Sequence, residues 1–264
     1  MIGAIIGDTA GSIYEFNNVK RTDIELFTKQ SDYTDDSIMS FAVAKWLLTD
    51  PLHTHKSLQD CMVEFGNKYR HPMGGYGGSF ASWLFCSEEE RKPYKSWGNG
   101  SAMRVSAVGW FFNTIEETEN VAKISAEVTH NHTEGIKGAQ ATAAAIYMAR
   151  IGKSKTEIKQ YIETRFKYDL NRTCDMIRPT YQFNESCQGT VPEAIIAFLD
   201  STDFENAIRL GISLGGDSDT LTCITGAIAE AFYKSIPSYM IDEVNKRLPS
   251  EFKLILEEMK AKSL

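Results

Sequence analysis

The sequence predicts an all-α fold, arranged as a compact orthogonal array of helices. Apolar residues recur with the helical period almost throughout the chain, and the alternating pattern of a β-strand is nearly absent. The expected helices are many and short, which favours an orthogonal array over a simple up-and-down bundle. No solenoid repeat is visible.

The expected helices are marked by apolar periodicity and by residues typical of helix ends. Ser154 precedes Glu157 in a capping-box pattern, and Asp203 comes directly before an apolar-periodic run. Pro249 breaks the last helix. The expected ranges are 3–14, 35–48, 58–69, 101–112, 118–129, 133–150, 155–167, 190–199, 203–213, 219–234 and 238–262.

Two glycine-rich segments depart from the ordinary helical pattern. Gly3, Gly7 and Gly11 lie on one face of the first helix, where each glycine costs about 1 kcal/mol relative to alanine. Close approach of another helix backbone would compensate, so we expect this helix to be tightly buried. The stretch 70–101 is rich in glycine and aromatic residues, and we expect a binding surface there.

Length and composition favour a single domain spanning residues 1–264. Hydrophobic residues make up 42% of the chain, enough for one large core, and no Pro/Gly/Ser-rich linker divides it. The net charge of −7 argues against a surface for duplex nucleic acid, because phosphates would be repelled. No stretch reaches the ~18 consecutive apolar residues that a membrane span needs.

The number and spacing of the cysteines indicate the cellular compartment in which the protein is expected to work. They are five in number, they are scattered, and none forms a CxxC pair. This usage is typical of reduced thiols in a cytoplasmic protein. Cys223 is interpreted as a buried, inert residue, with a reactive thiol as the alternative.

Two acidic segments stand at the predicted starts of helices. One is Thr34-Asp35-Asp36, and the other is the run from Gly215 to Thr220, which reads GGDSDT. Either segment alone fits an N-cap, because Asp and Thr are favoured there and the helix dipole favours negative charge. Two segments with two acids and a threonine each are harder to explain as caps, since one cap needs one side chain.

If these two helix starts meet in the fold, four carboxylates converge. Their mutual repulsion would be strongly unfavourable unless cations neutralise it, and two divalent cations balance four carboxylates. Oxygen ligands without His or Cys favour Mg²⁺, Mn²⁺ or Ca²⁺ over Zn²⁺. The sequence therefore predicts a two-metal centre.

At this point the chain resembles the ADP-ribosylglycohydrolase family, from about residue 2 to about residue 233. The motifs GAIIGDTAGSIYEF, TDDS, GGYGGSF, SWGNGSAMR, THNHTEGIKGAQ and GGDSDT occur in the family's order, and they are specific in combination. The common forms TDDT and GDTDT are TDDS and GDSDT here, where Ser37 and Ser218 keep a hydroxyl. The family is all-α with a two-metal centre, so the resemblance agrees with the reading from the residues.

The resemblance implies a set of metal ligands and catalytic residues. Two Mg²⁺ (or Mn²⁺) ions are the expected cofactors. Glu15 would lie on a mobile loop over the site, and Glu15 and Asp36 are the candidates for the general base. The implied metal ligands are Thr34, Asp35, Asp36, Asp217, Asp219 and Thr220.

The resemblance also implies residues that bind ADP-ribose. Backbone N–H groups of the first loop would meet the pyrophosphate, and Trp97 would stack on adenine. Core packing is the alternative for Trp97, a solvated surface position for Glu15, and a helix-end cap for His130 and His132. The implied substrate-binding residues are Gly77, Gly78, Ser79, Ser96, Trp97, Gly98, Asn99, Gly100, His130 and Gly135.

The expected reaction is hydrolysis of the glycosidic bond between ADP-ribose and a modified target. The expected partner is an ADP-ribosylated protein or a small ADP-ribose conjugate, with nucleic acid only as an ADP-ribosylated substrate and with no membrane. A cytoplasmic monomer is expected. The alternatives are a non-catalytic ADP-ribose-binding module, a structural relative, and another two-metal hydrolase such as a phosphoesterase.

Overall fold

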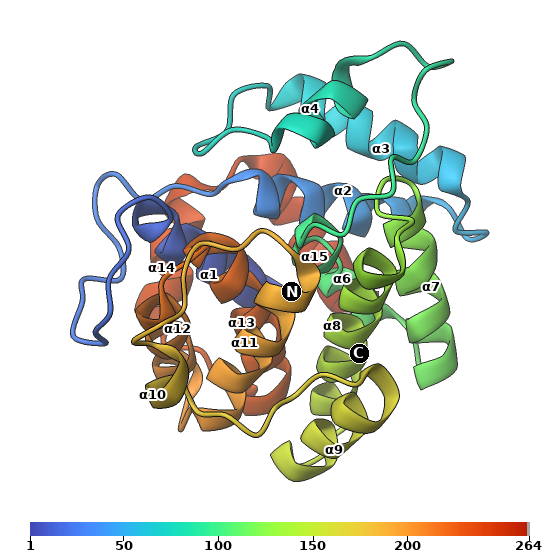
Figure 1. The fold of residues 1–264 in the computed structure, drawn as a ribbon. Coiled ribbons are helices and arrows are strands. Elements are labelled where there is room, and N and C mark those ends of the chain that lie inside the picture. Colours follow the sequence, from blue (N-terminus) through green and yellow to red (C-terminus); the bar gives the residue numbers. More distant parts are fainter. Residues whose placement is uncertain (263–264) are drawn as a thin grey trace.

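The computed structural model describes residues 1–262, and this part of the chain is helical with two isolated β-bridges, so the all-α prediction is confirmed. The helices pack around one another and are connected by loops (Figure 1). They are α1 Ile2–Gly11, the 3-10 helix η1 Ser12–Tyr14, α2 Asp35–Thr49, α3 His55–Lys68, α4 Gly78–Phe85, α5 Gly100–Met103, α6 Ser106–Phe111, α7 Ile115–Glu127, α8 Thr133–Arg150, α9 Lys155–Phe166, α10 Cys174–Ile177, α11 Cys187–Asp200, α12 Phe204–Leu214, α13 Ser218–Tyr233, α14 Ser238–Arg247 and α15 Ser250–Lys262.

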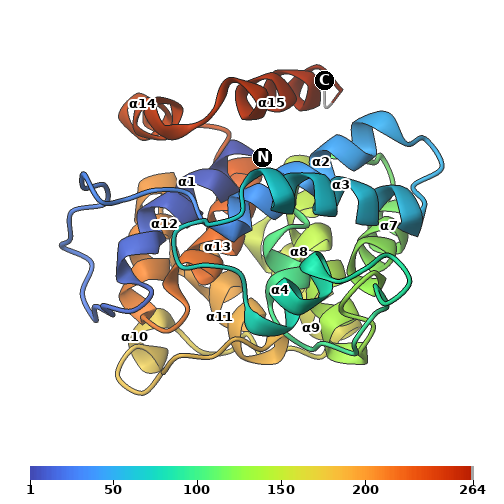
Figure 2. The same ribbon diagram turned by 90° about the horizontal axis from the view of Figure 1, so that it is seen from above.

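The core is built around α13. This helix is buried over most of its length, and α1, α8, α11 and α12 pack against it. The two C-terminal helices α14 and α15 pack over α1 and α2, where they form an outer layer (Figure 2). As a result, α1 lies between the central helix and this outer layer.

The glycine face of α1 lies directly on the backbone of α13. A β-carbon built at Gly3, Gly7 or Gly11 would lie 2.4, 2.0 or 2.5 Å from a backbone carbonyl oxygen of α13. Such distances are far below van der Waals contact, so no side chain fits at these positions. The close helix approach predicted from the glycine spacing is confirmed, and it holds the acidic end of α13 next to α1.

Several helix ends match the expectations from the sequence. Ser154 and Glu157 form both hydrogen bonds of a capping box at the start of α9. The side chain of Asp203 accepts a hydrogen bond from the Asn206 backbone N–H at the start of α12. Within residues 1–262, no helix is both long and apolar enough to cross a membrane.

Other elements differ from the prediction. The stretch 70–101 contains α4, a helix that the flanking glycines conceal and that buries Phe80, Trp83 and Leu84. The helix expected over 101–112 is divided into α5 and α6 by a turn at Arg104, whose side chain is fully buried. The short helix α10 was not expected, because four residues carry too little periodicity to reveal a helix.

Candidate active site

The starts of α2 and α13 meet α1, and acidic residues from all three helices converge. Thr34 is the N-cap of α2, and its side-chain oxygen accepts a hydrogen bond from the Asp36 backbone N–H at 3.2 Å. Asp217 is the N-cap of α13, but its carboxylate makes no capping hydrogen bond and instead accepts one from the Asn99 side chain at 2.7 Å. The capping interpretation therefore explains Thr34 and leaves the carboxylates unexplained.

Asp8 of α1 belongs to this cluster, and it was missing from the residues predicted from the sequence. It is fully buried, and its carboxylate accepts hydrogen bonds from the Thr34 backbone N–H at 3.0 Å, the Thr34 hydroxyl at 2.8 Å, the Ser37 backbone N–H at 3.1 Å and the Ser37 hydroxyl. Asp8 thus fixes the start of α2 against α1. The sequence did contain one indication of Asp8: it is the single acidic residue within a helix that was predicted to be tightly buried.

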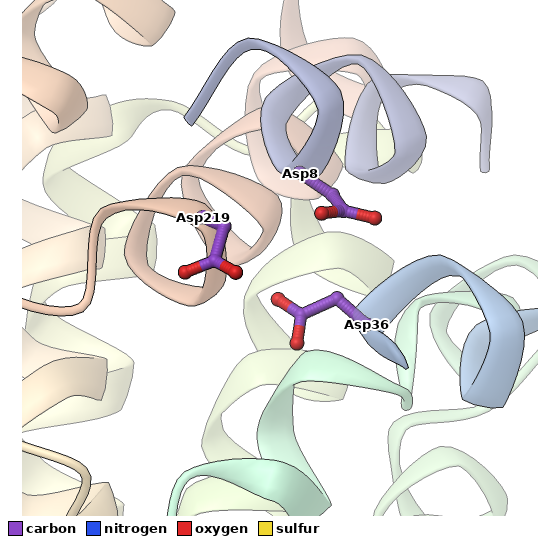
Figure 3. Close-up of side chains that lie close together, drawn as sticks. All are labelled: Asp8, Asp36 and Asp219. Carbon is purple, nitrogen blue, oxygen red and sulfur yellow. The ribbon is translucent and has the colours of Figure 1, made fainter. Parts of the chain in front are cut away.

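Asp8, Asp36 and Asp219 point toward one another from three different helices (Figure 3). One carboxylate oxygen of each lies within 4.8 Å of the others. Asp36 Oδ2 and Asp219 Oδ1 are buried and have no hydrogen-bond partner among the described residues. Buried carboxylate oxygens without a donor are costly, and a bound cation is the usual way to satisfy them.

A second group of carboxylates overlaps the first. Glu15, Asp217 and Asp219 each place an oxygen within 4.8 Å of the others, so Asp219 is common to both groups. Glu15 follows η1 and is half-buried, which excludes the solvated surface position considered from the sequence. Of the four carboxylates expected to converge, Asp36, Asp217 and Asp219 belong to these groups with Glu15 beside them, whereas Asp35 belongs to neither group.

The electrostatics of the cluster confirm how closely the acids crowd one another. Burial raises the pKa of Asp8 to about 6. Burial, and next the neighbouring carboxylates, raise the pKa of Glu15 to about 7. The same two causes in the same order hold the pKa values of Asp35, Asp36 and Asp219 well above the ordinary value. An oxygen-only set of this kind suits a hard divalent cation.

Two glycines form the turn that positions the acidic start of α13. Gly215 and Gly216 have φ values of 71° and 77°, in the left-handed region that favours glycine. They reverse the chain between α12 and α13, so Asp217 follows the turn directly. A β-carbon at Gly216 would also lie 2.5 Å from the ring of Tyr181.

The carboxylates open onto a cavity of about 390 Å³, a size found for small-molecule sites. Its wall is formed by the starts of α2, α4, α5 and α13, together with the loops before them. Most of the residues predicted from the sequence line it: Glu15, Asp35, Asp36, Gly77, Gly78, Ser79, Ser96, Gly98, Asn99, Gly100, His130, Asp217, Asp219 and Thr220.

Three predicted residues do not line this cavity. Thr34 is buried behind it, where its hydroxyl bonds Asp8. Gly135 lies in α8, and a β-carbon there would come within 2.6 Å of the Ser96 carbonyl oxygen, so this glycine lets the loop approach the helix. Trp97 is 54% exposed, which excludes core packing, and its ring meets His132 edge-on with centroids 5.8 Å apart.

The cavity wall also contains residues that sequence reasoning did not single out. Phe16 and Phe183 are exposed and stack with ring centroids 6.2 Å apart, although they are far apart in the sequence. Tyr94 and Arg104 lie in the same wall. No periodic pattern in the sequence indicates these four residues, because the residues that they contact in the cavity wall lie in loops or in other helices.

The remaining alternatives from the sequence are settled by burial and hydrogen bonding. His132 is the N-cap of α8, where its side chain accepts a hydrogen bond from the Glu134 backbone N–H. His130 is not a cap, because its ring nitrogen pairs with the Thr129 hydroxyl at 2.7 Å. Cys223 is fully buried and burial raises the pKa of its thiol, in agreement with an inert residue.

Known proteins resemble this chain over most of its length. ADP-ribosylhydrolase ARH3 of Homo sapiens is 25% identical, with 88% of this chain and 84% of that protein aligned. A putative ADP-ribosyl glycohydrolase of Acanthamoeba polyphaga mimivirus is 26% identical, with 92% and 89% aligned. An uncharacterized protein of Archaeoglobus fulgidus is 30% identical over a shorter part, which covers 62% of this chain and 56% of its own.

The fold and the family agree with these relatives. A solved structure described as an ADP-ribosylglycohydrolase-related protein complex superposes with a TM-score of 0.78 at 18% identity, covering 100% of this chain and 96% of that one. This similarity shows the shared fold. The sequence model of the ADP-ribosylglycohydrolase family matches residues 1–262. The chain therefore belongs to the ADP-ribosylglycohydrolase family and is an ADP-ribosyl glycohydrolase.

Proposed function

We propose that the carboxylate cluster holds two divalent cations, Mg²⁺ or Mn²⁺. Two overlapping groups of carboxylates share Asp219, and two buried oxygens lack a donor among the described residues, which supports a pair of neighbouring cations. Asp8 belongs to the first of these groups, and the hydrogen bonds that it accepts from Thr34 and Ser37 also hold the start of α2 in place. The proposed ligands are Thr34, Asp35, Asp36, Asp217, Asp219 and Thr220.

The chemistry that such cations supply when bound is to hold the vicinal diol of the distal ribose and to lower the pKa of a water molecule. Glu15 accepts a proton of the attacking water, whose oxygen forms the new bond to the anomeric carbon as the bond to the target breaks. The target departs with the electrons of that bond and takes up the proton that the water has lost, so free ADP-ribose and the unmodified target result. Burial is the largest cause of the raised pKa of Glu15, and a buried carboxylate accepts a proton more readily than an exposed one. Asp36 is the alternative base.

The cavity loops are proposed to bind the rest of ADP-ribose. A β-carbon at Gly77 or Gly78 would meet nothing within 4 Å, so these glycines leave space beside the first backbone N–H groups of α4. Such N–H groups suit the pyrophosphate. The exposed ring of Trp97 stacks on adenine, and Ser96, Gly98, Asn99, Gly100, His130 and Gly135 complete or support the site.

The chain is proposed to act as a cytoplasmic monomer consisting of one domain. All of its cysteines are free, which suits a reducing compartment. The proposed substrate is an ADP-ribosylated protein or a small ADP-ribose conjugate. A nucleic acid enters this proposal only as an ADP-ribosylated substrate.

The observation that carries the proposal is the pair of carboxylate groups that share Asp219 at the wall of one cavity. The test is to incubate the protein with substrates joined through arginine, serine, O-acetyl and nucleic-acid linkages, with Mg²⁺, with Mn²⁺ and with excess EDTA. Free ADP-ribose released only with a divalent cation is the expected result. Release of AMP or phosphate would indicate a phosphoesterase, and binding of ADP-ribose without turnover of any substrate would indicate a binding module.

A further inference from the structure

Three buried side chains, Arg104, Thr129 and His130, form a hydrogen-bonded network at the wall of the ligand cavity. The guanidinium of Arg104 donates to the Thr129 hydroxyl oxygen at 2.8 Å and to the Ser125 carbonyl oxygen at 2.8 Å. The Thr129 hydroxyl lies 2.7 Å from Nδ1 of His130. Arg104, Thr129 and His130 are all at most 4% exposed, so water does not compete for these hydrogen bonds.

The donor and acceptor capacities of the three side chains determine which group donates in each hydrogen bond of this network. A guanidinium only donates, so the Thr129 oxygen is the acceptor in its bond with Arg104. The single hydroxyl hydrogen of Thr129 then needs an acceptor, and within residues 1–262 the only one in reach is Nδ1 of His130. If Nδ1 carried a hydrogen instead, the buried hydroxyl hydrogen would be left without a partner, which is unfavourable.

The charge of Arg104 reinforces this arrangement. Burial lowers the pKa of Arg104 to about 10, so the guanidinium is still protonated at neutral pH. Burial, and next the charge of Arg104, hold the pKa of His130 well below its ordinary value, so its imidazole is neutral. A neutral imidazole that accepts at Nδ1 carries its only hydrogen on Nε2.

The other ring nitrogen of His130 lies beside two glycines of the cavity wall. A β-carbon at Gly100 would lie 3.2 Å from Nε2, and one at Gly98 would lie 3.4 Å away. His130, Gly98 and Gly100 all line the ligand cavity, and Nε2 has no hydrogen-bond partner among the described residues. A side chain at either glycine would crowd the nitrogen that faces the cavity.

We infer that Arg104 and Thr129 are positioning residues that fix His130 in the Nε2–H form, so that His130 offers an N–H donor to an oxygen atom of bound ADP-ribose. The ligand in this inference rests on the proposed function, whereas the assignment of the hydrogen does not. A donor whose hydrogen is fixed in advance needs no rearrangement when the ligand arrives. It also cannot accept from a ligand N–H or O–H group, which makes the subsite selective for ligand atoms that accept a hydrogen bond.

The hydrogen position is measured directly by nitrogen NMR of the ligand-free protein labelled with ¹⁵N-histidine. The chain has five histidines, and a spectrum of His130→Gln assigns the signals of His130. The expected result is an unprotonated Nδ1 and a protonated Nε2 in the folded wild-type protein at neutral pH. A protonated Nδ1 would overturn the inference, whatever the enzyme hydrolyses.

A matched pair of variants tests the role of Thr129. Thr129→Val keeps the shape but removes the hydroxyl, and Thr129→Ser keeps the hydroxyl. In Thr129→Val we expect mixed protonation of the two ring nitrogens and a Kd for ADP-ribose about 3- to 10-fold higher, the size of one hydrogen bond. Thr129→Ser should keep the wild-type NMR signals and a Kd within about 2-fold of wild type.

The two arms separate this inference from the proposed function. Wild-type signals and an unchanged Kd in a folded Thr129→Val protein would contradict the positioning role, even if the enzyme releases ADP-ribose normally. If Thr129→Val does not fold, the wild-type spectrum still decides the position of the hydrogen. Absence of any ADP-ribose hydrolysis alongside the expected spectrum would refute the proposed reaction and leave the inference on His130 standing.

Discussion

Glycine serves two regions of this molecule in opposite ways: the α1–α13 interface and the loops around the ligand cavity. In the interface, a β-carbon at Gly7 would lie 2.0 Å from a backbone oxygen, so the residue is small because a neighbour fills the space. In the cavity loops, a β-carbon at Gly77 would meet nothing within 4 Å. Close packing thus fixes the acidic cluster, whereas the loop glycines leave room for a ligand.

The same contrast appears in the exposure of the functional side chains. Asp8 and Asp36 are at most 1% exposed and are held by helix packing and hydrogen bonds. Phe16 and Trp97, at the loops, are 70% and 54% exposed. Changes on the packed side should therefore affect the chemical step or the fold, and changes on the loop side should affect the affinity for ligand.

The largest effect is expected for Asp219, which both carboxylate groups share. Asp219→Ala should lower kcat by several orders of magnitude because both proposed cation positions lose a ligand, while helical circular dichroism remains. Asp203→Ala is the matched control: it removes an aspartate at the start of α12 and should lower stability by about 1 kcal/mol without loss of activity. Near-wild-type turnover of Asp219→Ala would refute the metal assignment.

A pair of glycine substitutions tests the comparison directly. Gly7→Ala should destabilise the fold by about 3 kcal/mol or more, since the overpacked atom is backbone and cannot move aside. Gly77→Ala should leave the melting temperature unchanged and weaken ADP-ribose binding. Thermal melts and calorimetric titration separate the two effects. A stable Gly7→Ala protein would show that the helices can move apart.

Glu15 connects the two regions, since it follows α1 and η1 and lines the cavity. Glu15→Gln should lower kcat by about 10²- to 10⁴-fold, because glutamine cannot accept a proton, with little change in ADP-ribose affinity. Glu25→Gln, at an exposed position on the following loop, is the control and should behave as wild type. Loss of bound cation in Glu15→Gln would make Glu15 a ligand, and normal turnover would transfer the role of base to Asp36.

The stability of the cation-free protein should depend on pH. Asp8 and Glu15 have ordinary values of 3.8 and 4.5 and values of about 6 and about 7 in the fold. The folded state therefore holds more protons than the unfolded state between about pH 4 and pH 7, so stability falls as pH rises through that window. Melting temperatures in EDTA should decrease over this range, and added Mg²⁺ or Mn²⁺ should reduce the decrease. A flat profile in EDTA would mean that burial and the neighbouring acids do not raise the pKa values of Asp8 and Glu15 as described.

The smallest effect is expected at the exposed end of the cavity loops. Trp97→Ala should weaken binding of ADP-ribose by about 1–3 kcal/mol, the usual contribution of one base stacked on an aromatic ring. Trp97→Tyr should recover most of the loss, and neither substitution should alter the melting temperature, because the ring is already exposed. An unchanged Kd in the alanine variant would place adenine elsewhere, with the stacked Phe16 and Phe183 as the next candidates.

The sequence revealed those parts of the site that follow a local pattern. Asp36 and Asp219 could be identified because paired acids and a threonine at a helix start exceed what a cap needs. Asp8 was missed, although an acid in a helix predicted to be tightly buried was a signal, because its role depends on contact with Thr34 and Ser37. Glu15 was identified through family resemblance, and its place beside Asp217 follows from helix packing.

The fold shows the same division. Long helical segments such as α8 and α13 were predicted within about a residue or two at each end, because a long run without proline or strand-like alternation favours a helix. α4 was missed, since a run of glycines leads into it and its packing places Leu84 on α3. The hydrogen-bonded network of Arg104, Thr129 and His130 could not be predicted from the sequence. Hydrogen bonds between side chains of separate elements produce no regular spacing of residues along the sequence.

The glycine face of α1 fixes both the rotation of this helix about its axis and its position along α13. Each added residue turns an α-helix by about 100° and advances it by about 1.5 Å. Inserting one residue between Gly3 and Gly7 would rotate Gly3 off α13 or rotate Asp8 away from Thr34, and no single shift of the helix restores both. In the first turns of this protein, the number of residues between the glycines and Asp8 is therefore as restricted as the identity of those residues.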